Sequence, residues 1–213
     1  MDWELDPNRC LEPTEFMDFR HEVVVSCVDR LDLAGLKPKE RAVRAFNFVR
    51  DQVPYEFFAK VNRYEYVASH ILKIKKGFCV QKAMLLATLG RAAGIPSALV
   101  VADLRDYTMP QRLVCALGSN VLESHAVTAF HLDGRWVLAC PALSPDVVER
   151  RGLRLVEFTG EEDALLHSTT ASGERHAEYA RWRGIHADLP FDMIVSDYRK
   201  VYDHIVAKVQ QET

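Results

Sequence analysis

A cysteine at the start of a predicted helix is the residue whose surroundings best fit a catalytic role. Cys79 begins a run of strong helix formers that extends to Ala93. Unpaired N–H groups and the dipole at a helix N-terminus stabilise a thiolate, and Lys82, three residues on, adds a nearby positive charge. We therefore expect Cys79 to be a nucleophile with a lowered pKa, against the alternative of a small residue packed at a helix start.

A nucleophilic thiol needs a base, and a predicted hairpin supplies His125. Asp133-Gly134 between two apolar runs is typical of a two-residue turn, which sets the register of the two strands. In that register Val127 faces Cys140, and His125 shares the face of Val127. His125 and Cys140 are therefore predicted to be diagonal neighbours, an arrangement that a three-residue turn would break.

Apolar residues at helical spacing predict the helices that would position these side chains. The helix that begins at Cys79 is apolar on nearly every side, so we expect it to be buried and to end before Gly94 and Pro96. The other predicted helices cover Thr14–Leu33, Pro38–Val53, His70–Lys76 (with Ser69 as its N-cap and Gly77 as its C′ residue) and Asp188–Val209.

Strands are predicted mainly in the second half of the chain. They cover Ser97–Asp103, the two sides of the Asp133-Gly134 turn, and Leu153–Phe158. Helices followed by antiparallel strands predict an α+β fold in which the helix that starts at Cys79 packs on an antiparallel sheet.

The composition is that of an ordinary globular protein and excludes several classes. The chain has 213 residues, 48% hydrophobic and 27% charged, with a net charge of −3. We expect one domain over residues 1–213, with its core at about 38–160, and neither a nucleic acid nor a membrane as a partner. Five cysteines without a CxxC pair, and a first segment without an apolar leader, predict free thiols and a cytoplasmic location.

Several stretches of the sequence resemble the transglutaminase-like superfamily. They are GFCVQKAMLLATLGRAAGIPSALV, SHAV and DGRWVLACP, and the likeness to a bacterial branch continues through EFTGEEDALLH, GERHAEY and GIHADLPFDMI. The resemblance implies a papain-like fold with Cys79 as nucleophile and His125 as base. The third position, where an aspartate usually orients the histidine, is occupied by Cys140.

The cysteine at the third position is a chemical departure from that pattern. A carboxylate sets the tautomer of an imidazole and stabilises its charged form, and a neutral thiol does neither well. An acid from elsewhere is the first replacement to consider, with Asp163 ahead of Asp103 and Glu178. A backbone carbonyl, a water molecule or an unassisted histidine are the alternatives.

The expected reaction is acyl transfer through a Cys79 thioester. The substrate would be an amide, a peptide or an acyl thioester, and the acceptor water or an amine. Gln81 is a candidate oxyanion donor beside the Cys79 N–H, and Trp136 a candidate wall of the acyl site. No cofactor or metal is implied, calcium included, because the sequence has no EF-hand loop.

Three other interpretations use the same residues. Cys79, His125 and Cys140 together would be enough ligands for a zinc ion. Cys79 and Cys140 would form an inactivating disulfide if their geometry allowed it. A degenerate domain with the altered third residue would instead bind a peptide or a partner protein in the same cleft.

Overall fold

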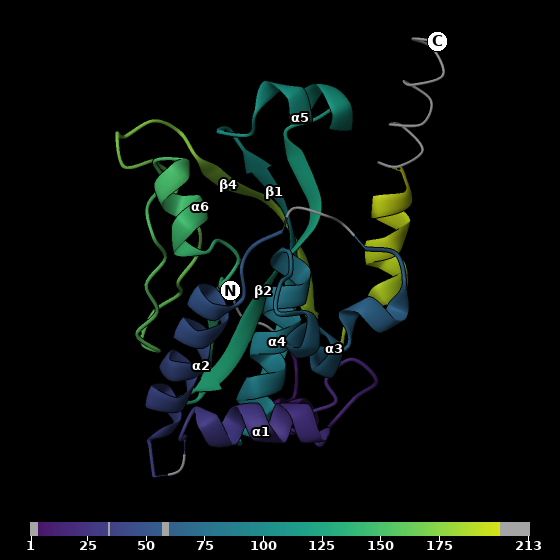
Figure 1. The fold of residues 1–213 in the computed structure, drawn as a ribbon, viewed down its shortest axis with the longest axis vertical. Helices are drawn as coiled ribbons and strands as arrows, with labels where there is room; N and C mark the ends of the chain where they lie inside the picture. Colours follow the sequence, from purple (N-terminus) through teal and green to yellow (C-terminus); the bar gives the residue numbers. More distant parts are fainter. Residues whose placement is uncertain (1–3, 34, 57–59, 201–213) are drawn as a thin grey trace.

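A four-stranded antiparallel sheet and a central buried helix organise the protein in the computed structural model, which describes residues 4–33, 35–56 and 60–200 (Figure 1). The elements are η1 (Pro7–Cys10), α1 (Glu22–Arg30), α2 (Pro38–Gln52), η2 (Arg63–Tyr66), α3 (Ala68–Ile74), α4 (Cys79–Ala92), β1 (Ser97–Asp106), α5 (Gln111–Leu117), β2 (Val121–Leu132), β3 (Arg135–Ala139), α6 (Pro145–Arg150) and β4 (Ala177–His186). A further helical stretch covers residues 191–200. The mixture of helices and antiparallel strands confirms the predicted α+β class.

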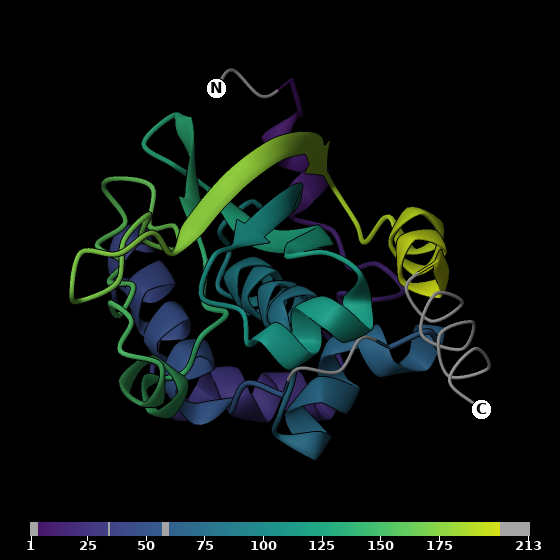
Figure 2. The ribbon, with the colours of Figure 1, turned by 90° about the horizontal axis from the view of Figure 1, so that it is seen from above.

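Helix α4 lies between the sheet and the N-terminal helices. It packs on β1 and β2 on one side and on α1, α2 and α3 on the other (Figure 2). Every residue from Cys79 to Arg91 is buried. The prediction of a buried helix is confirmed, because a helix that is apolar on all sides is stable only when neighbours cover all of it.

The strand order is β3-β2-β1-β4, and each neighbouring pair is antiparallel. The turn at Asp133 and Gly134 has positive φ angles of 49° and 82°, as a two-residue hairpin turn requires. Leu132 pairs with Arg135 and Thr128 with Ala139, so the register predicted for the hairpin is confirmed.

Two predicted helices have different boundaries in the structure. The first begins at Glu22 rather than near Thr14, because the His21 side chain accepts the N–H of Val23 and caps the helix there. The third begins at Ala68, so Ser69 is not its N-cap; the N–H of Ser69 donates to the Asp18 carboxylate at 3.0 Å. That helix ends in the left-handed residue Lys75, and Gly77 is not its C′ residue.

The strand predicted over Leu153–Phe158 is absent from the structure, although the segment lies within the described residues. Leu153, Val156 and Phe158 are buried, so the segment packs its apolar side chains on the core without joining the sheet. The carbonyl of Val156 accepts a hydrogen bond from the Arg50 guanidinium at 2.8 Å. Its partner is therefore a side chain and not the backbone of a neighbouring strand.

The last predicted helix is present over residues 191–200, and its remaining part lies outside the described residues. None of the described helices is both long and apolar enough to cross a lipid bilayer.

Candidate active site

Cys79 is the first residue of α4, and side-chain hydrogen bonds from Gln81 hold the turn that precedes it. The Gln81 side chain accepts the N–H of Phe78 at 3.3 Å and donates to the carbonyl of Glu65 at 2.7 Å. A Cβ on Gly77 would lie 3.0 Å from the Cβ of Gln81, so any larger residue there would have to displace Gln81. Gln81 is therefore committed to the backbone around Cys79, and the structure does not support it as an oxyanion donor.

His125 lies on β2, directly after a residue in a left-handed conformation. Ser124 has a φ of 57°, which costs a non-glycine residue on the order of 1–3 kcal/mol. The Ser124 hydroxyl donates to the Asp197 carboxylate at 2.7 Å, and the Ser124 N–H donates to Asp103 at 3.3 Å. Arg183 bonds both carboxylates, so a buried network holds the backbone that carries His125.

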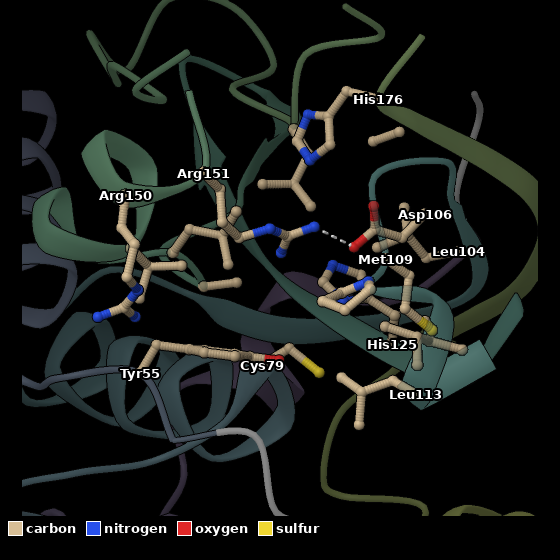
Figure 3. Close-up of a pocket in the computed structure, with 17 residues that line it drawn as sticks. Tyr55, Cys79, Leu104, Asp106, Met109, Leu113, His125, Arg150, Arg151 and His176 are labelled. Atoms are coloured by element: carbon tan, nitrogen blue, oxygen red, sulfur yellow. Dashed lines mark hydrogen bonds and ion pairs between the residues drawn. The ribbon is translucent and has the colours of Figure 1, made fainter. Parts of the chain in front are cut away.

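Cys79 and His125 line the same pocket (Figure 3). The Cys140 Sγ is 3.6 Å from the Nε2 of His125, which confirms the neighbour relation predicted from the hairpin register. Nε2 therefore faces Cys140, and Nδ1 is the ring nitrogen that does not.

Burial controls the protonation of both reactive groups. It raises the pKa of Cys79 to about 12, even though backbone N–H groups of Ala126, Val80 and Cys79 itself stabilise the thiolate. Burial also lowers the pKa of His125 to about 4. The pair therefore rests as a neutral thiol and a neutral imidazole, and the expectation of a lowered Cys79 pKa is wrong.

Lys82 does not assist Cys79 as the sequence suggested. Its side chain is fully buried, and its amine donates to the carbonyl of Arg50 at 3.2 Å. Burial lowers the pKa of Lys82 to about 7, and its charge interacts with Cys140 rather than appearing among the influences on Cys79.

The three acids proposed as orienting groups are engaged elsewhere. Asp163 accepts the backbone N–H of Leu138 at 2.8 Å, and Asp103 belongs to the network around Ser124. Glu178 accepts from the Tyr107 hydroxyl. Burial is the cause of the lowered His125 pKa, and no carboxylate of the described residues contributes to it. The structure thus does not place Asp163 in the orienting role.

Tyr179 is a neighbour of this site that the sequence did not reveal. Its ring meets the ring of His125 edge-on, with 5.8 Å between the centroids, and its hydroxyl opposes the rise that burial causes in the pKa of Cys140. Tyr179 lies on β4, a strand that local patterning did not predict, and only its pairing with β1 brings it to the site.

Trp136, a disulfide and a zinc ion were the other sequence-based candidates for this site. Trp136 meets His131 at 5.2 Å between ring centroids and is not among the residues that line the pocket. No disulfide joins any of the five cysteines, all of which lie in described segments. Among the described residues, no group of three or more His, Cys, Asp or Glu side chains is placed to hold a metal ion, so these residues give the zinc interpretation no support.

The pocket has a volume of about 390 Å³ and mostly apolar walls. At its far end, the Arg151 guanidinium donates to Asp106 at 2.7 Å, and His176 lies beyond this pair (Figure 3). The sequence did not single out Asp106 or Arg151. The apolar wall includes Leu104, Met109, Leu113, Leu122, Leu143 and Leu166.

Comparisons with known proteins bear on this arrangement. A solved structure from Cytophaga hutchinsonii, provisionally described as a cysteine protease, is 13% identical, with a TM-score of 0.48 over 86% of this chain and 55% of that one. This chain thus covers about half the length of that protein. The search among curated proteins found no match to this chain. The family model of the transglutaminase-like superfamily matches residues 26–141, which include Cys79, His125 and Cys140. Since the match covers more than half of the sequence, the chain belongs to the transglutaminase-like superfamily.

Proposed function

We propose that this protein is a cysteine-dependent acyltransferase in which Cys79 attacks the carbonyl carbon of an amide or thioester. The observation that carries the proposal is the pocket itself: Cys79 at the start of α4 and His125 on β2 line one cavity. A nucleophile and a base from separate elements meeting at a cavity are the minimum that acyl transfer requires.

The resting charges define the order of the steps. Because the thiol and the imidazole are both neutral, His125 takes the Cys79 proton at Nδ1 while Sγ bonds to the substrate carbon. As that bond forms, the C=O pair moves onto the substrate oxygen, and the backbone N–H groups of Cys79, Val80 and Ala126, which lie close to Sγ, are the donors proposed to stabilise this oxyanion. The carbon–nitrogen or carbon–sulfur bond then breaks, and the leaving group receives the proton from His125.

The Cys79 thioester is then opened by an acceptor. His125 removes a proton from that acceptor and returns it to the departing Sγ. Water as the acceptor makes the protein an amidase or peptidase, and a primary amine makes it a transamidase. The mostly apolar walls of the pocket favour an acyl group with an aliphatic or aromatic body.

The test uses activated esters, which need little help from the enzyme. The protein is mixed with p-nitrophenyl acetate, butyrate and hexanoate, with and without a fluorescent primary amine. We expect release of p-nitrophenol, an acyl adduct on the peptide that carries Cys79, and faster reaction with butyrate and hexanoate than with acetate. Mass spectrometry of the products shows whether water or the amine is the acceptor.

Two variants make the result decisive. Cys79→Ala should abolish the reaction, whereas Cys115→Ala, which changes an exposed cysteine away from the pocket lining, should not. Circular dichroism confirms that both variants fold. A folded protein that never acylates Cys79 with any of the three esters overturns the proposal in favour of a binding module in the same cleft.

A further inference from the structure

We propose that Arg151 determines the substrate of this pocket by binding a carboxylate at the end of an aliphatic acyl chain whose carbonyl lies at Cys79. The acyl donor is then a dicarboxylic acid in which one acid group forms the ester, amide or thioester and the other stays free. The proposal rests on the function proposed above and adds the chemical group that the far end of the pocket recognises.

Arg151 and Asp106 come from distant elements and meet at the far end of the pocket. Asp106 is the last residue of β1, and Arg151 directly follows α6, where its backbone N–H donates to the carbonyl of Val147 at 3.0 Å. The Asp106 Oδ1 accepts the N–H and the hydroxyl of Thr108 at 2.9 and 2.8 Å, and Oδ2 accepts from the Arg151 Nη2 at 2.7 Å. Both carboxylate oxygens are occupied, so the acid holds the arginine in place.

The Arg151 guanidinium has hydrogen-bonding capacity that the protein does not use. Its bonds to Asp106 and to the Thr108 hydroxyl, at 2.7 and 2.6 Å, both come from Nη2 (Figure 3). Within residues 4–33, 35–56 and 60–200, neither Nε nor Nη1 of Arg151 has a hydrogen-bond partner, and neither nitrogen is sealed from solvent. Nε carries one N–H group and Nη1 carries two, so the pocket contains donors that await an acceptor.

The charges of the pocket lining favour a single carboxylate as that acceptor. The lining contains two arginines, Arg150 and Arg151, and one acid, Asp106, which leaves one positive charge in excess. The histidines add none at neutral pH, because burial lowers the pKa of His125 to about 4 and also lowers the pKa of His176. A carboxylate balances this excess, whereas a phosphate monoester, with a charge of about −1.5 to −2 at pH 7, exceeds it.

The walls of the pocket fit the chain that would join the two ends of such a substrate. They are mostly aliphatic side chains, against which methylene groups pack without losing hydrogen bonds. A chain that ends in a methyl group would displace water from the Arg151 guanidinium and leave its donors without an acceptor, which costs free energy. A terminal carboxylate replaces that water with charge-assisted hydrogen bonds.

The test compares esters that differ only at the far end of the acyl chain. The mono-p-nitrophenyl esters of adipic, pimelic and suberic acid end in a carboxylate, and their p-nitrophenyl methyl diesters end in a neutral group. Succinate and glutarate esters are unsuitable because their own carboxylate attacks the ester. For at least one chain length we expect kcat/KM to be at least about tenfold higher for the acid, the lower limit for a hydrogen bond to a charged group. Equal or lower values for the acid at all three lengths overturn the proposal.

Variants then assign this preference to Arg151. Arg151→Met should abolish the preference, and Arg151→Lys, which keeps a cation beside Asp106 but removes Nε and Nη1, should reduce it. Arg150→Met is the matched control: it also removes one positive charge, but from a side chain that is 70% exposed, so the preference should change by less than about threefold. Circular dichroism shows which variants fold, and Arg151→Lys decides if Arg151→Met does not. An unchanged preference, or equal losses in the Arg150 and Arg151 variants, overturns the proposal.

A binding measurement separates this proposal from the acyltransferase proposal. Saturation-transfer NMR compares the monomethyl and dimethyl esters of the same acids on Cys79→Ala, which has no nucleophile, with and without Arg151→Lys. We expect tighter binding of the monomethyl ester, and loss of that difference with Arg151→Lys. If this is found while Cys79 is never acylated, the acyltransferase proposal fails and the carboxylate site stands. If Cys79 is acylated without preference for the acids, the carboxylate site alone fails.

Discussion

At the scale of single residues, desolvation outweighs the helix terminus at Cys79. A helix N-terminus is worth about 0.3–1 kcal/mol for a nearby negative charge. The rise of the Cys79 pKa from 9.0 to about 12 corresponds to about 4 kcal/mol against the thiolate. The same residue would be activated at an exposed helix start, but the cover of β2 and the surrounding core reverses the balance.

This balance predicts an unusual order of reactivity towards iodoacetamide. At pH 7 the exposed Cys115 should be alkylated before Cys79, and the Cys79 rate should rise steeply only above pH 9. Peptide mass spectrometry against pH measures both rates in one sample. Alkylation of Cys79 first at pH 7, with an apparent pKa below 9, would contradict the neutral resting pair.

At the scale of elements, α4 contains a lysine, Lys82, whose charge opposes its burial. Burial holds the pKa of Lys82 at about 7, against 10.5 when it is exposed. The unfolded chain therefore binds more protons between these values, and the contribution of Lys82 to stability falls by about 5 kcal/mol as the pH drops from 10.5 to 7.

We therefore expect Lys82→Met to raise the free energy of unfolding, and to raise it more at pH 7 than at pH 10. The loss of the bond to the Arg50 carbonyl offsets about 1 kcal/mol of the gain. Urea unfolding at the two pH values measures the difference, with the exposed Lys73→Met as control. An equal change at both pH values would show that Lys82 stays charged in the fold.

Strand β2 depends on a network that holds Ser124 in its left-handed conformation. In the part of the chain that the structure describes, Arg183 forms hydrogen bonds with all three other members of the network, Asp103, Asp197 and Ser124. Arg183→Met removes the cation paired with Asp103 and leaves Asp197 with Lys200 alone, so it should lower stability by roughly 3 kcal/mol. Thermal unfolding tests this against Arg181→Met, an exposed arginine of the same strand; equal effects of the two changes would refute the role of the network.

At the scale of the whole molecule, the buried neutral His125 links stability to pH. Its pKa is about 4 in the fold against 6.5 in the unfolded chain, so the unfolded state binds more protons between these values. The contribution of His125 to stability is complete above pH 6.5 and is lost as the pH falls towards 4, a loss of about 3 kcal/mol.

Replacing this histidine should flatten the acid side of the stability curve. The free energy of unfolding should fall between pH 7 and pH 4 in both proteins. We expect the fall to be about 3 kcal/mol smaller in His125→Asn than in the unmodified protein. His70→Asn, which replaces a half-buried histidine of α3, is the matched control. Parallel curves for His125→Asn and the parent would mean that His125 titrates normally.

Local signals in the sequence determined a large part of this protein. The turn residues Asp133 and Gly134 set a hairpin register, and that register placed His125 beside Cys140. An apolar pattern on all sides of the helix from Cys79 determined that α4 is buried. These inferences succeed because turn chemistry and hydrophobic periodicity act over a few neighbouring residues.

Only the tertiary structure decided how the reactive groups are charged and what supports them. Lys82 is buried in the core, Asp163 bonds a backbone N–H, and Tyr179 contacts the His125 ring from a strand that follows β2 by more than forty residues in the chain. A pKa depends on how much water is removed and on which groups replace it, and both follow from contacts between distant segments. The sequence therefore determined that His125 meets Cys140 and that α4 is buried, and the packing around them decided which other groups reach the site and how the reactive groups are charged.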